Sequence, residues 1–314
     1  MDAHLIDNYV WSEKYRPLTI EECILPEHIK DMFLGFISSK NFPHLMLSGG
    51  AGTGKTTSAK ALCNQLGYEY ILINGSDQRN IDTVRTTIRD FASSMSMYGK
   101  PKCIIIDESD GFSNIAQAAL RATMEEFHFV KFILTCNYKN KLIEPIHSRT
   151  TCIDFTSSKQ DRSGLLLEFV KRVFSILKQE NVTFDKGVVV EIVKKFYPDN
   201  RRILNELQRL SSVGSIDTDA LTLLSNTNID SLISSLKKRE LTGARQWIVD
   251  NVNMDIEIFY TDFYNAMYIE CVPDDIPQAI LVISKYMYQG SFVVDQEINL
   301  MAMMVELMQT VGFK

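Results

Sequence analysis

The first half of the chain alternates short apolar runs with stretches of helical periodicity. Apolar runs of strand type occupy residues 45–47, 70–73, 103–106 and 132–134. Residues 54–66, 82–95 and 114–126 instead repeat apolar side chains every three to four positions, which predicts helices between these runs. Continuous apolar strands separated by helices are typical of a parallel sheet covered on both faces. This part of the chain is therefore predicted to be an α/β domain.

The rest of the chain shows helical periodicity only. Residues 158–224 predict several short helices, two of them capped by Asp185 and Asp199. A polar stretch at 224–228 is the predicted linker. The part that follows is predicted to be all-helical and contains no motif that we can tie to chemistry. Because 314 residues are too many for one compact core, the length predicts two or three domains, which we place at residues 1–157, 158–225 and 226–314.

Composition narrows the possible functions. The formal charge is −6, so any contact with nucleic acid has to come from a local patch or from several subunits together. No apolar run approaches the ~20 residues of a membrane span, and the N-terminus lacks the pattern of a signal peptide. The six cysteines form no C-x-x-C pair, which argues against a zinc site and a disulfide framework. We expect a protein of the reducing cytoplasm with no membrane partner.

One glycine-rich segment carries the clearest chemistry. Residues 49–57 (GGAGTGKTT) follow an apolar strand and open a helix, which is the context of a phosphate-binding loop. Its glycines let several backbone N–H groups face one point, and the following helix adds the positive end of its dipole. Lys55 can reach the β- and γ-phosphates, and the Thr56 hydroxyl can ligate Mg²⁺. The segment predicts a nucleotide-binding protein; a glycine-rich turn that matches by chance is the alternative.

Two other strands end in polar residues. Asp107 and Glu108 follow the run 103–106, and Asn137 follows the next run. Ligands of parallel sheets bind beyond the carboxyl ends of the strands, so these side chains are expected to converge with Lys55. Asp107 would then hold the hydration shell of Mg²⁺, Glu108 would polarise the attacking water as general base, and Asn137 would position that water or sense the γ-phosphate. A solvated strand end and an ordinary turn asparagine are the plainer alternatives.

The order of these motifs resembles that of an AAA+ ATPase, and in particular of a sliding-clamp-loader subunit of the replication factor C small-subunit type. The resemblance is carried by residues 11–17 (WSEKYRP), 74–77 (NGSD), 107–110 (DESD), 117–125 (QAALRATME), 136–138 (CNY), 148–150 (SRT) and 198–202 (PDNRR). Residues 23–26 (CILP) and the short chain resemble the large ATPase subunit of T-even-type phage clamp loaders. Thr150 stands where the family has cysteine, so local packing there is expected to differ. The family implies a P-loop ATPase core over 1–157, a helical lid over 158–225 and a helical collar over 226–314.

The resemblance also implies roles for particular residues. Around adenine and ribose it places Ser12, Glu13, Lys14, Tyr15 and Ile24. Around the phosphates it places Gly52, Thr53, Gly54, Lys55, Thr56 and Thr57. Arg201 would contact the γ-phosphate from the lid of the same chain, whereas Arg149 would reach a neighbouring subunit's site as an arginine finger. Such a guanidinium stabilises the charge that spreads over the γ-oxygens, and one supplied in trans makes hydrolysis depend on ring assembly. An exposed surface cation is the alternative for either arginine.

A second set of residues concerns DNA. Arg85 and Arg89 lie four residues apart on one flank of a predicted helix, and Arg79 and Asn80 precede its positive end. In clamp loaders this region faces DNA inside a spiral of subunits. The resemblance therefore implies phosphate contacts that follow the shape of the duplex rather than its sequence. A solvated helix face is the alternative.

The implied function is that of a clamp-loader ATPase. ATP binding would drive ring assembly and clamp opening, and primer–template DNA would trigger hydrolysis and clamp release. The implied partners are further copies of the chain, a distinct small subunit, a sliding clamp and primer–template DNA, with ATP and Mg²⁺ as cofactors. An AAA+ DNA translocase or helicase is the alternative, which the lack of an added DNA-reading module disfavours. A scaffold that binds ATP only structurally is the third, and Lys55, Asp107, Glu108 and Arg149 argue against it.

Overall fold

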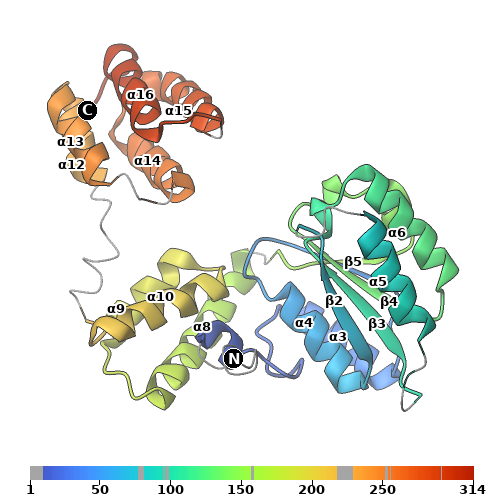
Figure 1. Cartoon of the computed structure of the whole chain (residues 1–314). Helices are drawn as coiled ribbons and strands as arrows, with labels where there is room; N and C mark the ends of the chain where they lie inside the picture. The colour runs from blue at the N-terminus through green and yellow to red at the C-terminus, as the bar shows by residue number, and fades with distance from the viewer. Residues whose placement is uncertain are drawn as a thin grey trace. The chain divides into compact units, whose positions relative to one another are not determined.

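The computed structural model describes residues 10–76, 81–94, 96, 99–156, 159–217, 229–251, 254, 256–290 and 292–314. The chain divides into two compact units, Met1–Thr218 and Asp219–Lys314, whose elements are labelled in Figure 1. The predicted lid–collar boundary at residue 225 and the predicted linker at 224–228 fall outside the described residues. Among the helices of the described ranges, none is long and apolar enough to span a membrane.

A parallel sheet forms the centre of the first unit, as predicted. Its five strands are β1 (Leu45–Ser48), β2 (Glu69–Asn74), β3 (Lys102–Asp107), β4 (Lys131–Cys136) and β5 (Thr151–Asp154), in the order β2-β3-β4-β1-β5. In register, Ile106 of β3 lies opposite Ile73 and Leu134, and Leu45 of β1 lies opposite Ile133. Because β3, β4 and β1 are neighbours in this order, the residues that follow them are brought to one edge of the sheet.

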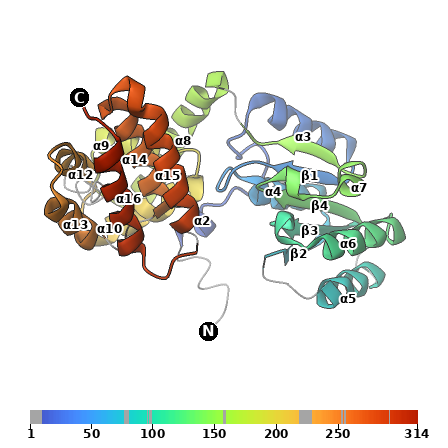
Figure 2. The ribbon, with the colours of Figure 1, turned by 90° about the horizontal axis from the view of Figure 1, so that it is seen from above.

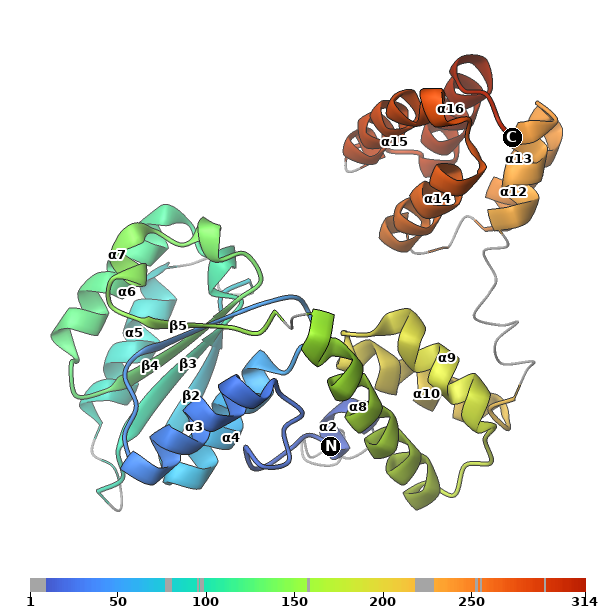
Figure 3. The same ribbon diagram turned by 180° about the vertical axis from the view of Figure 1, so that it is seen from behind.

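Helices cover both faces of this sheet. α3 (Glu27–Ser39) and α4 (Lys55–Leu66) pack on the face that carries Leu45 and Leu47, and Figure 3 shows the two helices side by side. α5 (Ile81–Ser93), α6 (Asn114–Glu126) and the short α7 (Glu144–His147) pack on the opposite face, which carries Met46, and Figure 2 shows α5 beside α6. Successive side chains of a strand point to opposite faces, so strands covered on both sides are apolar throughout.

In the described residues that follow the sheet, the first unit contains the helices α8 (Lys159–Gln179), α9 (Lys186–Phe196) and α10 (Asn200–Val213). Phe169, Val193 and Leu207 are buried between them. Asp185 accepts the N–H of Val188 and Asp199 accepts the N–H of Arg202, each at 3.0 Å, so both predicted N-caps are confirmed. The single-turn α2 (Trp11–Lys14) attaches to this bundle, because the N–H of Trp11 donates to Oε1 of Gln208 on α10 at 2.9 Å.

The second unit is all-helical in its described residues. It consists of α12 (Ile229–Lys237), α13 (Leu241–Asp250), α14 (Ile256–Glu270), α15 (Ile276–Gly290) and α16 (Gln296–Thr310). Its core contains Trp247 and Phe263 together with Met303, Met304 and Leu307 of α16. The methionine-rich end of the chain is therefore core packing material. Within the described residues, single 3₁₀ turns also occur at Ser109–Gly111, Lys139–Lys141 and Pro273–Asp275.

Candidate nucleotide-binding site

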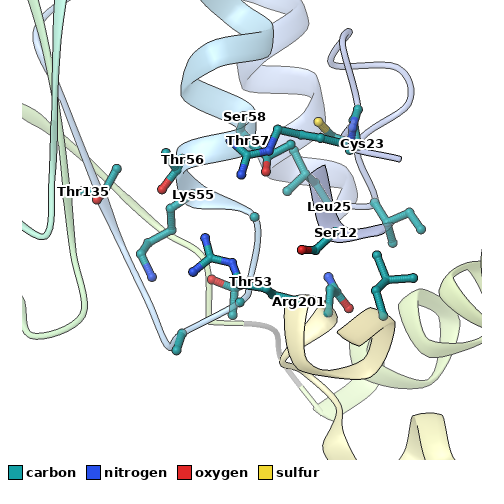
Figure 4. Close-up of a pocket in the computed structure, with 18 of the residues that line it drawn as sticks. Ser12, Cys23, Leu25, Thr53, Lys55, Thr56, Thr57, Ser58, Thr135 and Arg201 are labelled. Carbon is teal, nitrogen blue, oxygen red and sulfur yellow. The ribbon is translucent and has the colours of Figure 1, made fainter. Parts of the chain in front are cut away.

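The glycine-rich segment forms the turn between β1 and α4. Gly52 (φ +69°) and Gly54 (φ +94°) adopt left-handed backbone conformations, which residues with a Cβ avoid. α4 begins at Lys55, and its N-cap Gly54 has no side chain to satisfy the first N–H groups, which leaves them for an anion. All six residues assigned to the phosphates line one cavity, together with residues of the N-terminal segment, the strand ends and α10 (Figure 4): Gly52, Thr53, Gly54, Lys55, Thr56 and Thr57.

Lys55 is buried in this cavity. Its Nζ donates to the carbonyl oxygens of Gly49 (2.7 Å) and Gly50 (2.6 Å) and to Oδ1 of Asn137 (2.9 Å). Burial lowers the pKa of Lys55, and the Asp107 carboxylate works in the opposite direction. A buried ammonium is stabilised by a neighbouring anion, so this position is electrostatically prepared for a phosphate.

Asp107, at the end of β3, is held by two hydroxyl groups. Oγ1 of Thr56 donates to Oδ1 of Asp107 at 2.7 Å, and Oγ1 of Thr135 donates to the same oxygen. The Thr56 hydroxyl and the Asp107 carboxylate are oxygen donors of the kind that Mg²⁺ takes, and they could hold the ion with its water shell. Our sequence interpretation missed Thr135. The sequence feature that could have indicated Thr135 is a hydroxyl residue within the otherwise apolar buried part of β4.

Glu108 follows with an uncommon backbone conformation. Its φ is +52°, in the left-handed region, and its N–H donates to Oγ1 of Thr135 at 3.1 Å. A non-glycine residue held in this region is strained, and such strain is concentrated at functional sites. Asn137, after β4, is positioned by Asp110, whose Oδ2 accepts the N–H groups of Asn137 (3.3 Å) and Tyr138 (3.1 Å). Asp107, Glu108 and Asn137 line the same cavity as Lys55, so the four side chains converge as the sheet topology predicts.

The first turn of α10 reaches the same loop. The N–H of Asn200 donates to the carbonyl oxygen of Gly52 at 3.3 Å, and Arg201 lines the cavity. Figure 4 shows Arg201, Thr53 and Lys55 around one space. The charge of Arg201 acts on Lys55 and is among the influences that lower its pKa. The loop and α10 are packed so closely that a Cβ on Gly52 would lie 1.9 Å from Oδ1 of Asp199.

The N-terminal segment forms another wall of the cavity, but not with all of the predicted residues. Ser12, Tyr15 and Ile24 line it, whereas Glu13 and Lys14 do not. Glu13 pairs with Arg16, and Lys14 pairs with Glu180 of the α8–α9 connection at 2.6 Å. The structure therefore does not bring Glu13 and Lys14 into this cavity, and their predicted contact with the nucleotide stays a prediction. Residues three or four apart share one face of a helical turn, so Ser12 and Tyr15 face the cavity while the two residues between them face elsewhere.

Two arginines of this region were not singled out from the sequence. Arg16 and Arg172 both line the cavity. The guanidinium of Arg172, on α8, donates to the carbonyl oxygens of Tyr15 (2.8 Å) and Glu22 (2.9 Å), and so fixes the segment that carries Tyr15. Arg172 is one of two arginines in α8, and its place in the sequence carries no pattern that indicates a contact with the N-terminal segment.

Arg149 lies after α7 and does not line the cavity of its own chain. Its Nη1 donates to the carbonyl oxygen of Pro145 (2.9 Å) and to Oγ of Ser148 (3.2 Å), and its Nη2 pairs with Glu125 at the end of α6. At the position where the family has cysteine, Oγ1 of Thr150 donates to the carbonyl oxygen of Ile146 at 2.9 Å. Thr150 thus hydrogen-bonds to α7 through its side chain.

The candidate DNA-contact residues are placed in part. Arg85 and Arg89 are both exposed on α5, and Arg79 and Asn80 lie outside the described residues. Arg89 forms an ion pair with Glu126 of α6 at 3.1 Å. A phosphate that binds Arg89 would have to compete with the Glu126 carboxylate. The helical spacing of the two arginines did not indicate this ion pair.

These features together define a P-loop ATPase of the AAA+ class. They are a phosphate-binding loop, an acidic strand end, a polar residue after the strand between them, and a helical bundle that contacts the loop. Residues 45–157 match the AAA family model, "ATPase family associated with various cellular activities". Residues 161–222 match the model "Sliding-clamp-loader large subunit, AAA+ ATPase lid domain".

Relatives extend this result to the rest of the chain. The sliding-clamp-loader large subunit of Escherichia phage RB69 is 36% identical over 290 residues, covering 90% of this chain and 88% of the relative. That of Enterobacteria phage T4 is 33% identical over 307 residues and covers 95% of both chains. The replication factor C small subunit of Sulfolobus acidocaldarius is 37% identical over 222 residues, 68% of this chain and 66% of the relative. The chain belongs to the sliding-clamp-loader family of AAA+ ATPases.

A solved structure supports the fold. The RuvB Holliday junction branch migration motor of Thermotoga maritima matches 71% of this chain and 80% of its own with a TM-score of 0.55 and 18% identity. At that identity the likeness concerns the fold alone, so it does not favour a branch-migration activity for this chain.

Proposed function

We propose that the chain is the ATPase subunit of a sliding-clamp loader, and that a neighbouring copy in a ring completes its site. The observation that carries this proposal is the different placement of two arginines. Arg201 lines the chain's own cavity, whereas Arg149 lies outside it and is held by Glu125 at the C-terminal end of α6. When an ATPase site is completed by a neighbouring subunit, its arginine finger has to lie outside the cavity of its own chain, as Arg149 does.

Within the cavity, we assign a role to each of these side chains from its position and chemistry. Lys55 and the N–H groups of the loop bind the β- and γ-phosphates of ATP. Thr56 and Asp107 hold Mg²⁺, which when bound neutralises phosphate charge. Glu108 acts as general base on the attacking water, and Asn137, which already contacts Lys55, positions that water or senses the γ-phosphate.

The same proposal assigns the remaining contacts. Ser12, Tyr15 and Ile24 enclose the adenine and ribose, and Arg201 contacts the γ-phosphate. The ring contains further copies of this chain and a distinct small subunit, and it acts on a sliding clamp in the cytoplasm of the cell in which replication takes place. The clamp contacts the surface near residues 111–126, where Ile115 is 76% exposed.

Primer–template DNA is proposed to stimulate hydrolysis by contacting α5. Arg85 is exposed and Arg89 can exchange its Glu126 partner for a phosphate, so both could follow the DNA backbone. Arg79 and Asn80, which precede this helix in the sequence, belong to the same proposal. Contacts of this kind recognise the shape of the duplex and are weakened by salt.

The experiment that tests the proposal is ATP turnover by the complex of this chain with its loader partners. Turnover is compared without DNA, with primer–template DNA, and with primer–template DNA plus the cognate clamp. A rise that needs both the primer–template junction and the clamp supports the loader. A rise with plain single strands that is indifferent to the clamp would favour a translocase, and binding of ATP without hydrolysis under any condition would favour a scaffold.

A further inference from the structure

The last turn of α6 carries two adjacent carboxylates, Glu125 and Glu126. Both lie at the negative end of the helix dipole, where a carboxylate destabilises the helix. Each is neutralised by an arginine from another element: Glu126 by Arg89 of α5 at 3.1 Å, and Glu125 by Arg149 from the segment after α7. The dipole of α6 gives no reason for a carboxylate at Glu125, and a pair with Arg121 within the helix would not need the further contact with Arg149, so that contact is the feature to be explained.

The Arg149 guanidinium is held by three acceptors. Its Nη1 donates to Pro145 and Ser148, and its Nη2 donates to Glu125. Arginine has five N–H donors, so these contacts leave two for a phosphate oxygen within the part of the chain that the structure describes. The Arg149 side chain is 32% exposed, which leaves it open to a neighbouring molecule while its direction is fixed.

Glu125 holds a second cation as well. Arg121, one turn earlier on α6, donates to Oε1 of Glu125 at 3.2 Å. Together with Arg149, it holds the pKa of Glu125 below its usual range, so this carboxylate stays ionised. Because two guanidinium groups share one carboxylate, the cluster keeps a net positive charge. The partnership with Glu125 therefore orients Arg149 without cancelling its attraction for a phosphate.

We propose that Glu125 is a positioning residue for Arg149: it holds the guanidinium pre-oriented before the neighbouring subunit's nucleotide arrives. This inference rests on the proposed role of Arg149 as an arginine finger. A long, flexible side chain that is already fixed loses less conformational freedom when it meets the transition state. Donors that need no reorganisation at the moment of reaction are the most effective at stabilising developing charge.

The test is steady-state ATP turnover by the assembled loader at saturating primer–template DNA and clamp. Glu125→Gln is expected to lower kcat by roughly tenfold with an unchanged KM for ATP, since misplacing a catalytic group by about 1 Å can cost up to about a hundredfold. Glu125→Asp, which keeps the charge, should recover part of the loss. Arg149→Ala is expected to lower kcat by ~10³-fold or more. Glu206→Gln, which breaks an ion pair with Arg209 on α10, is the matched control and should turn over like the unmodified loader.

The double variant Glu125→Gln/Arg149→Ala separates positioning from other effects. If Glu125 acts through Arg149, the double variant turns over no more slowly than Arg149→Ala alone. Additive losses would overturn the inference, and so would failure of Glu125→Gln and Glu125→Asp to assemble in size-exclusion chromatography. An unchanged kcat for Glu125→Gln beside a lowered one for Arg149→Ala would overturn the positioning role only. An unchanged kcat for Arg149→Ala would overturn the role of Arg149 as an arginine finger, and with it the central argument for the proposed function.

Discussion

Replacing Gly52 by alanine is expected to weaken ATP binding through both the loop and the helix that rests on it. Gly52 has φ +69°, and a left-handed conformation costs a residue with a Cβ about 1–2 kcal/mol. The new Cβ would also lie 1.9 Å from Oδ1 and 2.8 Å from Cα of Asp199. A carboxylate can rotate away, but a backbone atom moves only if the first turn of α10 moves with it.

Two responses are open to the Gly52→Ala chain, and both weaken binding. The loop can leave the left-handed region and lose the alignment of its N–H groups, or it can keep its conformation and push away the turn that carries Arg201. Restoring the binding geometry costs at least the ~1–2 kcal/mol of backbone strain. At about 1.4 kcal/mol for a tenfold change, the Kd for ATP should rise by roughly 5- to 30-fold, and the contact with Asp199 adds to this.

The assay is a fluorescence titration of the chain with a fluorescent ATP analogue. Gly67→Ala is the matched control: Gly67 ends the same helix with φ +70°, and within the described structure its added Cβ would meet no atom within 4 Å. It should lower the free energy of unfolding by ~1–2 kcal/mol and leave the Kd unchanged. An unaltered Kd for Gly52→Ala, or an equal rise for Gly67→Ala, would refute the reasoning.

Four further outcomes are expected. Glu108→Gln should retain nucleotide binding but lose turnover by roughly 10²-fold or more, because a general base contributes ~10²–10⁴-fold; turnover like that of the unmodified loader would remove Glu108 as the base. Arg85→Glu should reduce stimulation by DNA and flatten its dependence on salt, measured as turnover between low and high salt; an unchanged salt dependence would contradict the DNA contact. Phe263→Ala, in the core of the second unit, should cost about 3–5 kcal/mol of stability, seen as an earlier urea transition of that unit. Burial lowers the pKa of His44, so on acidification the unfolded chain binds a proton at this position before the folded chain does. The neutral imidazole therefore contributes to the stability of the fold fully above the pKa of an unfolded histidine, and this contribution is lost as the pH falls from that value through the lower pKa of the folded chain. His44→Asn should therefore lessen the drop in urea midpoint between pH 7 and pH 5, and an equal drop in both proteins would exclude this origin.

The α/β fold of the first unit and its central chemistry could be predicted because both are local in the sequence. The strands are short apolar runs, and the loop at 49–57 contains all six residues assigned to the phosphates within nine positions. Asp107, Glu108 and Asn137 each follow such a run directly, so the rule that ligands bind at the carboxyl ends of parallel strands was enough to bring them together. The caps at Asp185 and Asp199 are equally local, since each bonds a backbone N–H three residues on.

Where the structure differs from the arrangement expected from the sequence, the cause is a contact between distant segments. Thr135 meets Asp107 only because β4 lies beside β3. Glu13 and Lys14 stand in the same motif as Ser12 and Tyr15, but the rotation of one helical turn directs them away from the cavity. That rotation is fixed by bonds to Gln208 and Glu180, which lie more than 160 positions away in the chain.

The sequence by itself thus determined the class of site and the type of sheet, because a phosphate loop and each buried parallel strand consist of consecutive residues with a recognisable pattern. The tertiary structure alone decided which partner each charged side chain meets. Glu125 and Glu126 are consecutive and chemically alike, yet one holds Arg149 and the other Arg89. Nothing in their spacing distinguishes them; the difference arises because adjacent residues of a helix point about 100° apart, and α6 packs between the two elements that supply these arginines.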